Sequence, residues 1–189
     1  DDGYVQDHNA MTFDGTQYIE FDEVTINGSF EIEFLFKFGG GTNRTIFGQS
    51  SNSAMLLRVQ DSTTFRFNIN GSYYDFTVPD LTTEIKHYRF VRDATFNVSL
   101  YINGVFSEAG PIASSNVYYD LIGVRGGLTE FLTTGTVLAL IKFTRSDGTV
   151  VADFPLSEGP GVGGSNAKVC EVVSGTLIDV TNGCSWTTR

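Results

Sequence analysis

The sequence predicts an all-β protein built as an antiparallel β-sandwich or jelly roll. Short segments rich in β-branched and aromatic residues follow one another along the 189 residues, and turn pairs that contain glycine separate them. No stretch shows the 3.6-residue period of an amphipathic helix. The chain is 41% hydrophobic and contains 16 Phe, which is enough for one core without metals or disulfides.

The first strands are predicted near the start of the chain. Met11–Phe13 and Tyr18–Phe21 flank the turn pair Asp14-Gly15. In Phe30–Phe38, phenylalanine or isoleucine occupies every second position, and glutamate, leucine and lysine occupy the positions between them. This period of two predicts a strand with one face in the core.

The later strands are separated by turns of the same kind. Asn-Gly pairs occur at residues 70–71 and 103–104, and they are strong hairpin signals because both residues accept a positive φ. Asp147-Gly148 marks another turn. The further predicted strands are Thr45–Gln49, Met55–Val59, Thr64–Ile69, Tyr73–Val78, Lys86–Arg92, Asn97–Tyr101, Leu121–Val124, Thr136–Thr144 and Val150–Phe154.

A break in composition predicts where the main sandwich ends. Ser157–Ser165 contains four Gly and one Pro. We therefore expect one jelly-roll domain over residues 1–159 and a C-terminal extension over residues 160–189, either as packed strands or as a connector. Cys170 and Cys184 lie in this extension, and they either form a disulfide or remain two thiols.

The net charge of −10 restricts the partners of the chain. With 12 basic and 22 acidic residues, it is a poor match for nucleic acid and for anionic membrane surfaces. No apolar run approaches the roughly 18–20 residues needed to span a bilayer. The polar start contains no apolar leader region, so we expect a processed or cytosolic chain, or a virion component assembled without secretion.

Several segments resemble, in the same order, motifs of laminin-G-like and concanavalin A-like jelly rolls. Residues 86–106 resemble the pattern H-x-x-x-x-R-D … L-Y-x-N-G, and residues 11–19 resemble F-D-G-x-x-Y-I. Residues 29–34 are similar to S-F-T-I-E, residues 122–127 to I-G-x-R-x-G, residues 135–143 to the G-x-I strand, and residues 153–159 to the Y-P-L-x-E-G ending of bacterial and phage versions. The single Trp, Trp186, departs from families that carry Trp on core strands.

The resemblance implies a concanavalin A-like fold and a binding role. Proteins of this kind are lectins, glycan-binding appendages of enzymes, receptor ectodomains and phage tail or capsid proteins. We expect a lectin-like carbohydrate-binding module on a phage virion or an extracellular or bacterial surface. The alternatives are a virion structural or decoration protein that assembles with other surface proteins or as a homo-oligomer, and a glycoside hydrolase or polysaccharide lyase.

Polar residues on several strands predict a ligand-binding surface. They share strand faces by the period of two, and if their strands are neighbours they form a groove for neutral or acidic sugars. The alternative is a solvated, charge-balanced sheet face. The predicted ligand-binding residues are Arg66, Tyr73, Asp75, His87, Arg89 and Tyr118.

Neither catalysis nor calcium binding has a complete motif. Glu31 and Glu33 share a strand face, as in the E-x-D-x-x-E pattern of the related glucanases, but the third carboxylate is missing, so we expect no enzyme. The resemblance implies that loop residues could hold one Ca²⁺, and the predicted ligands are Asp93, Asn103 and Asp120, with Asp14 as a further candidate. The alternative is that these residues only form turns.

Overall fold

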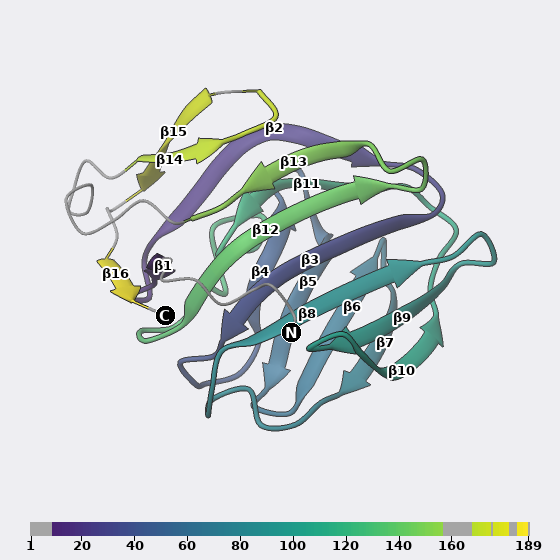
Figure 1. Ribbon diagram of the computed structural model, residues 1–189, viewed down its shortest axis with the longest axis horizontal. Helices are drawn as coiled ribbons and strands as arrows, with labels where there is room; N and C mark the ends of the chain where they lie inside the picture. Colours follow the sequence, from purple (N-terminus) through teal and green to yellow (C-terminus); the bar gives the residue numbers. More distant parts are fainter. Residues whose placement is uncertain (1–8, 157–167, 175, 182–184, 189) are drawn as a thin grey trace.

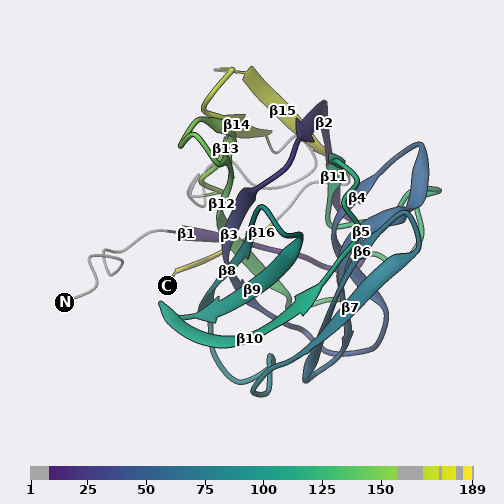
Figure 2. The ribbon, with the colours of Figure 1, turned by 90° about the vertical axis from the view of Figure 1, so that its right-hand side faces the viewer.

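The computed structural model describes residues 9–156, 168–174, 176–181 and 185–188. These residues form 16 strands and no helix. The strands make two antiparallel sheets, which pack face to face as a sandwich (Figures 1 and 2). The predicted all-β sandwich is therefore confirmed. No membrane-crossing helix occurs in this part of the chain.

Each sheet contains eight strands. Sheet A has the order β10-β9-β8-β3-β12-β1-β16, with β13 also paired to β12. Its strands are β1 (Asn9–Thr12), β3 (Phe30–Lys37), β8 (Lys86–Arg92), β9 (Asn97–Ile102), β10 (Val105–Pro111), β12 (Val137–Arg145), β13 (Val150–Phe154) and β16 (Ser185–Thr188). Sheet B has the order β14-β15-β2-β11-β4-β5-β6-β7. Its strands are β2 (Tyr18–Ile26), β4 (Arg44–Gln49), β5 (Asn52–Asp61), β6 (Thr64–Ile69), β7 (Ser72–Thr77), β11 (Val117–Ile122), β14 (Lys168–Glu171) and β15 (Thr176–Thr181).

The core consists mainly of aromatic rings from the two inner faces. Phe34 and Phe36 of β3 lie 6.4 and 5.9 Å from the ring of Phe65 in the opposite sheet, and Phe90 of β8 lies 5.7 Å from the same ring. All four side chains are fully buried. Each contributes on the order of 1.5–3 kcal/mol by leaving water. The alternation predicted for residues 30–38 holds for the charged positions, which are partly exposed, but Leu35 between Phe34 and Phe36 is buried as well.

The predicted hairpin turns have the predicted backbone. Asn70 and Gly71 have φ values of 53° and 89°, and Asn103 and Gly104 have 50° and 79°. Positive φ at both central residues is the geometry that matches the twist of the flanking strands. These turns connect β6 to β7 and β9 to β10.

Four strands differ most from the prediction. The second strand continues past Phe21 to Ile26, β5 spans Asn52–Asp61 instead of Met55–Val59, β11 begins at Val117 instead of Leu121, and β10 is a separate strand that the sequence did not predict. The added part of β2 and the whole of β10 lack a clean alternation of buried and exposed residues. Strand β10 contains glycine and ends in proline, which an edge strand of a sheet tolerates.

Strands near the C-terminus extend both sheets. In sheet B, β15 pairs with β2 through Val180 and Ile19, and in sheet A, β16 pairs with β1. The predicted boundary near residue 159 lies outside the described residues. Cys184 also lies outside them, so the disulfide stays a prediction.

One lateral edge of the sandwich is closed by side chains. The Tyr74 hydroxyl and the Thr77 backbone N–H, both on edge strand β7, donate hydrogen bonds of 2.8 Å to the carboxylate of Glu108 on edge strand β10. A β-carbon at Gly110 would lie 2.1 Å from the Tyr74 ring, so only glycine fits beside it. The edges of the two sheets are therefore joined at this side (Figure 2).

Candidate functional site

The predicted ligand-binding residues do not form one surface. His87 and Arg89 lie on β8 in sheet A, whereas Arg66 on β6 and both Tyr73 and Asp75 on β7 lie in sheet B. The groove depended on these strands being neighbours, and this condition holds for β6 and β7 but not for β8, which pairs with β3 and β9. The residues point outward from two different sheets and make two separate clusters. Tyr118 lies on β11 in sheet B, and its hydroxyl accepts a hydrogen bond from Asn116.

The sheet A cluster is a set of ion pairs on the outer face. Arg89 pairs with Glu31 at 2.7 Å, and Glu33 lies 3.1 Å from His87 Nε2 and 3.7 Å from Lys142 Nζ. The hydrogen bond with His87 and the charges of His87, Lys142 and Arg89 lower the pKa of Glu33, although partial burial opposes them. Glu33 is thus an ionised carboxylate surrounded by basic groups.

The sheet B cluster places an exposed aromatic ring beside an ion pair. Arg66 donates two hydrogen bonds of 2.7 Å to Asp75, which raise the pKa of Arg66. The same guanidinium lies 3.9 Å from the ring centroid of Tyr73, whose side chain is 53% exposed. These three predicted residues are together, but as an isolated group on the outer face.

The predicted calcium ligands do not come together. Asp93 and Asn103 lie in turns at opposite ends of β9, and Asp120 lies within β11 and not in a loop. Each side chain has a local role: Asp93 accepts hydrogen bonds within its turn, Asn103 accepts the His87 backbone N–H at 2.9 Å, and Asp120 accepts the Ser50 N–H at 2.7 Å. The Asp14 carboxylate likewise accepts two bonds from Thr16.

Within the described residues, no three His, Cys, Asp or Glu side chains are grouped to hold a metal ion. The structure does not bring the three predicted ligands together, since Asp93 and Asn103 lie at opposite ends of β9. Their side-chain oxygens accept hydrogen bonds from backbone N–H groups of turns and strands. This agrees with the alternative given above, in which loop Asp and Asn residues form turns. Calcium binding itself stays a prediction.

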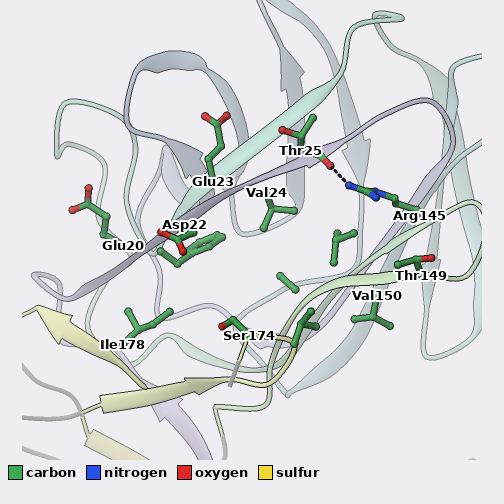
Figure 3. Close-up of a pocket in the computed structure, with 14 residues that line it drawn as sticks. Glu20, Asp22, Glu23, Val24, Thr25, Arg145, Thr149, Val150, Ser174 and Ile178 are labelled. Carbon is green, nitrogen blue, oxygen red and sulfur yellow. Dashed lines mark hydrogen bonds between the residues drawn. The ribbon is translucent and has the colours of Figure 1, made fainter. Parts of the chain in front are cut away.

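A cleft opens at the lateral edge opposite the one where Glu108 joins β10 to β7. It lies between β2 and β13, has a volume of about 710 Å³, and is also lined by Val173, Ser174 and Ile178. Ser174 and Ile178 lie on the side of the cleft away from Glu20 and Glu23 (Figure 3). The cleft volume falls within the roughly 300–1,000 Å³ typical of small-molecule sites. We call it the β2–β13 cleft. None of the predicted ligand-binding residues lines it.

A bulge in β2 shapes one wall of this cleft. Glu20 pairs with Leu121 of β11 and Val24 pairs with Tyr119, so β2 has two extra residues in this stretch. Bulges of this kind re-aim side chains and are common beside binding sites. Here the bulge leaves both Asp22 and Glu23 exposed, and Glu23 accepts a hydrogen bond from Gln49 at 2.6 Å.

The cleft has an apolar floor and a polar rim. Phe21, whose ring lies 4.9 Å from that of Phe154, forms part of the floor together with valine and alanine side chains of β13. The rim carries Asp22, Thr149 and Ser174 and the guanidinium of Arg145, which donates a hydrogen bond of 3.4 Å to the Thr25 carbonyl. In Figure 3, Glu20 and Glu23 extend from β2 away from Ser174 and Ile178. The cleft can therefore contact both apolar surface and hydroxyl groups of a ligand.

The sequence could not show this cleft because its walls come from distant segments. Residues 20–25, residues 145 and 149–152, and residues 173, 174 and 178 meet only in the folded chain. The one local signal was the run Glu20 to Thr25, in which the alternation of β2 fails. Such an interruption is compatible with a bulge or with a strand end, and the sequence alone favours the strand end.

Comparison with known proteins gives the fold. No protein-family model matches the chain, and no curated protein matches its sequence. Among solved structures, a candidate carbohydrate-binding protein from Bacteroides ovatus is similar with a TM-score of 0.73 at 17% identity, over 97% of this chain and 60% of that one. This chain therefore spans less than two thirds of that protein.

Two further structures have the same architecture. A heptameric SAP-like pentraxin from Limulus polyphemus has a TM-score of 0.56 at 15% identity, over 72% of this chain and 75% of that one. Domains LG4-5 of the mouse laminin α1 chain have a TM-score of 0.54 at 14% identity, over 79% and 44%. The resemblance seen in the sequence motifs is confirmed: this chain has the concanavalin A-like jelly-roll fold that pentraxins and laminin G domains share.

Proposed function

We propose that this chain is a non-enzymatic carbohydrate-binding module that binds a neutral glycan in the β2–β13 cleft. The observation that carries the proposal is the pairing of an apolar floor with a rim of hydroxyl and charged side chains. A sugar ring needs both, because its C–H faces pack on apolar groups and its hydroxyls exchange hydrogen bonds. The jelly-roll fold is compatible with this role but does not establish it.

The charge at the cleft favours a neutral ligand over an acidic one. Glu20, Asp22 and Glu23 all lie on the β2 wall, and Arg145 is the basic residue among the lining side chains. The whole chain carries a net charge of −10. Sulfated or sialylated glycans would be repelled at this edge of the sandwich.

The paired glutamates of β3 are poor candidates for glycoside hydrolysis. A glycosidase needs one carboxylic acid that stays protonated near neutral pH, which requires a raised pKa. The pKa of Glu33 is lowered by the His87 hydrogen bond and nearby positive charges, and Glu31 is paired with Arg89. These contacts support a binding role over a catalytic one.

The test is a glycan array with matched double variants. Asp22→Ala/Thr149→Ala changes two exposed rim residues of the cleft, His87→Ala/Arg89→Ala changes the sheet A cluster, and Tyr73→Ala alters the sheet B cluster. We expect the rim variant to bind at least ten-fold more weakly, because two lost hydrogen bonds are worth about 1 kcal/mol each. The other two variants should bind like the wild type.

Two outcomes would redirect the proposal. Hits that persist in the rim variant but disappear in one of the other variants would move the site to that predicted cluster. An array with no hits would contradict the proposed carbohydrate-binding function. A parallel array with EDTA tests calcium, since a calcium-dependent module loses its hits when the ion is chelated.

A second candidate is a structural role in assembly on a phage or bacterial surface. Val105 and Phe106 at the β9–β10 hairpin are 70% and 57% exposed, and Phe106 packs edge-on against Tyr101 at 5.8 Å. Exposed aromatic and aliphatic groups that are contiguous mark protein interfaces. Light scattering of the wild type and of Phe106→Ser tests it: assembly predicts an oligomer that the variant dissociates, and a monomeric wild type argues against it.

A further inference from the structure

A second, smaller cleft is lined in part by residues that follow β3 and residues that precede β12. The end of β3 and the start of β12 lie side by side at the left of Figure 1. The cleft has a volume of about 350 Å³. We call it the Arg44 cleft, and it is lined by Gly15, Gly39, Gly40, Gly41, Arg44, Phe131, Thr133 and Thr134. Its size suits one sugar residue or a molecule of similar size.

The guanidinium of Arg44 has no counter-charge among the described residues. Arg44 forms none of their ion pairs and none of their side-chain hydrogen bonds, and its Nε is buried without a partner. The nearby carboxylate of Glu130 is already paired with Arg58 at 3.3 Å and with Arg125 at 2.6 Å. An anion that enters the cleft would therefore meet a guanidinium with no carboxylate partner and with an unused Nε donor.

The other arginines of the described residues are paired within the fold. Each contacts a carboxylate or a backbone carbonyl, namely Arg58, Arg66, Arg89, Arg92, Arg125 and Arg145. Arg145 also lines a cleft, but it donates a hydrogen bond to the Thr25 carbonyl, whereas Arg44 lines its cleft without such a contact. Its charge is therefore available to a ligand.

The glycine loop holds the guanidinium in place. A β-carbon at Gly41 would lie 3.4 Å from Arg44 Nε and 3.8 Å from Nη2, so the side chain lies across the Gly41 backbone. Gly40 and Gly41 have φ values of 109° and 94°, which L side chains rarely adopt. Glycine thus lets the loop bend under Arg44 and leaves the cleft open above it.

The threonines supply acceptors and Phe131 supplies an apolar wall. Thr133 donates its hydroxyl to the Gly40 carbonyl at 2.7 Å, and Thr134 donates to the Asp14 carbonyl at 2.6 Å. Because these hydrogens are used, both oxygens remain able to accept hydrogen bonds from ligand hydroxyls. A ligand that fits has a negative group for Arg44, hydroxyls for the threonines and a C–H face for Phe131.

We propose that the Arg44 cleft is a second binding site, which takes an acidic sugar residue such as a uronic acid through its carboxylate. A planar carboxylate matches the guanidinium, and the sugar hydroxyls and C–H face match the threonines and Phe131. This site goes beyond the proposed function, because it lies apart from the β2–β13 cleft and selects an anionic ligand instead of a neutral one.

The test is an NMR titration of the ¹⁵N-labelled chain with glucuronate, glucose and acetate. We expect glucuronate to shift the amide signals of Gly39, Gly40 and Gly41, and glucose and acetate to bind at least ten-fold more weakly. Arg44→Gln should also bind glucuronate at least ten-fold more weakly than the wild type. Arg145→Gln, which removes an equal charge from the other cleft, should keep them, and thermal unfolding verifies that both variants fold.

Three results would overturn the proposal. Equal binding of acetate and glucuronate would make this only a general anion site, and equal binding of glucose would remove the role of the carboxylate. Unchanged glucuronate binding by Arg44→Gln would place the ligand elsewhere. A glycan array without hits would contradict the proposed function of the β2–β13 cleft but not this proposal. The NMR titration follows the amide signals of Gly39, Gly40 and Gly41 at the Arg44 cleft, and it uses a different sugar.

Discussion

Arg92 is fully buried, and its guanidinium is hydrogen-bonded to backbone carbonyl groups instead of a carboxylate. Its Nε donates to the Gly28 carbonyl at 2.7 Å, and its Nη1 donates to the carbonyls of Ala113 and Ser115 at 3.2 and 2.8 Å. The guanidinium lies 4.6 Å from the ring centroid of Phe30. Burial lowers the pKa of Arg92, and the hydrogen bonds to the three carbonyl groups stabilise its charged form. One side chain thus ties the β2–β3 turn to the loop before β11.

We expect Arg92→Met to lower the free energy of unfolding by about 3 kcal/mol or more. Methionine has a similar length but leaves three carbonyl groups without this donor, and each unsatisfied group costs about 1–3 kcal/mol. Urea denaturation measures the change. A loss under about 1 kcal/mol would show that the loops are held mainly by other contacts.

Glu33 makes the stability of sheet A depend on pH. Because the pKa of Glu33 is lowered from 4.5 in the folded state, its stabilising contribution is complete above that value and is lost as pH falls through the folded pKa. At pH 7 we expect Glu33→Gln to be less stable than the wild type by about 1 kcal/mol. Below pH 4.5 the difference should shrink toward zero.

The matched control for this series is Glu84→Gln. Glu84 pairs with Lys86 at 3.2 Å, but its side chain is 67% exposed, so the pair is screened by water. Urea midpoints of the three proteins from pH 3 to 8 should show a pH-dependent loss for Glu33→Gln only. A loss of the same size for Glu33→Gln at every pH would contradict the role of the ionised carboxylate.

At the scale of elements, Gly110 and Tyr74 set how closely the edge strands β10 and β7 approach. We expect Gly110→Ala to destabilise the chain by about 1–3 kcal/mol, because its methyl group would overlap the Tyr74 ring. In a Tyr74→Ala background the same substitution should cost much less. Equal losses in both backgrounds, measured by a double-mutant cycle in urea, would mean that the loss does not come from overlap with the Tyr74 ring.

The sequence predicted single strands better than their pairing. The alternation in residues 30–38 identified β3 because side-chain direction is a local property of an extended chain. The partners of β3 are β8 and β12, which lie about 50 and 100 residues further along the chain. No local pattern encodes such a distance, so the sequence left open whether β8 adjoins β6 and β7, and the structure shows that it does not.

At the scale of the whole molecule, the C-terminal strands complete both sheets and one end of the cleft. We expect a chain that ends at residue 159 to have a lower urea midpoint than the full chain, because β2 loses its pairing with β15 and β1 loses its pairing with β16. The bare edge of β2 should also promote self-association.

This truncation tests the predicted domain division. An unchanged midpoint and a monomer by light scattering would mean that residues 1–159 fold by themselves, as the composition break at Ser157–Ser165 suggests. A destabilised chain would mean that the extension belongs to the same folding unit. Glycan affinity should fall with the truncation, since Val173, Ser174 and Ile178 bound the cleft.

The two lateral edges of the sandwich differ in how freely they can separate. Glu108 fastens one edge by bonds to both a side chain and a backbone N–H of β7, whereas the opposite edge holds a cleft between β2 and β13. Opening motions of the two sheets should therefore pivot about the Glu108 edge and widen the cleft. Amide hydrogen exchange would then be slow at Thr77 and faster along β13, and a bound ligand would slow exchange on the cleft side alone.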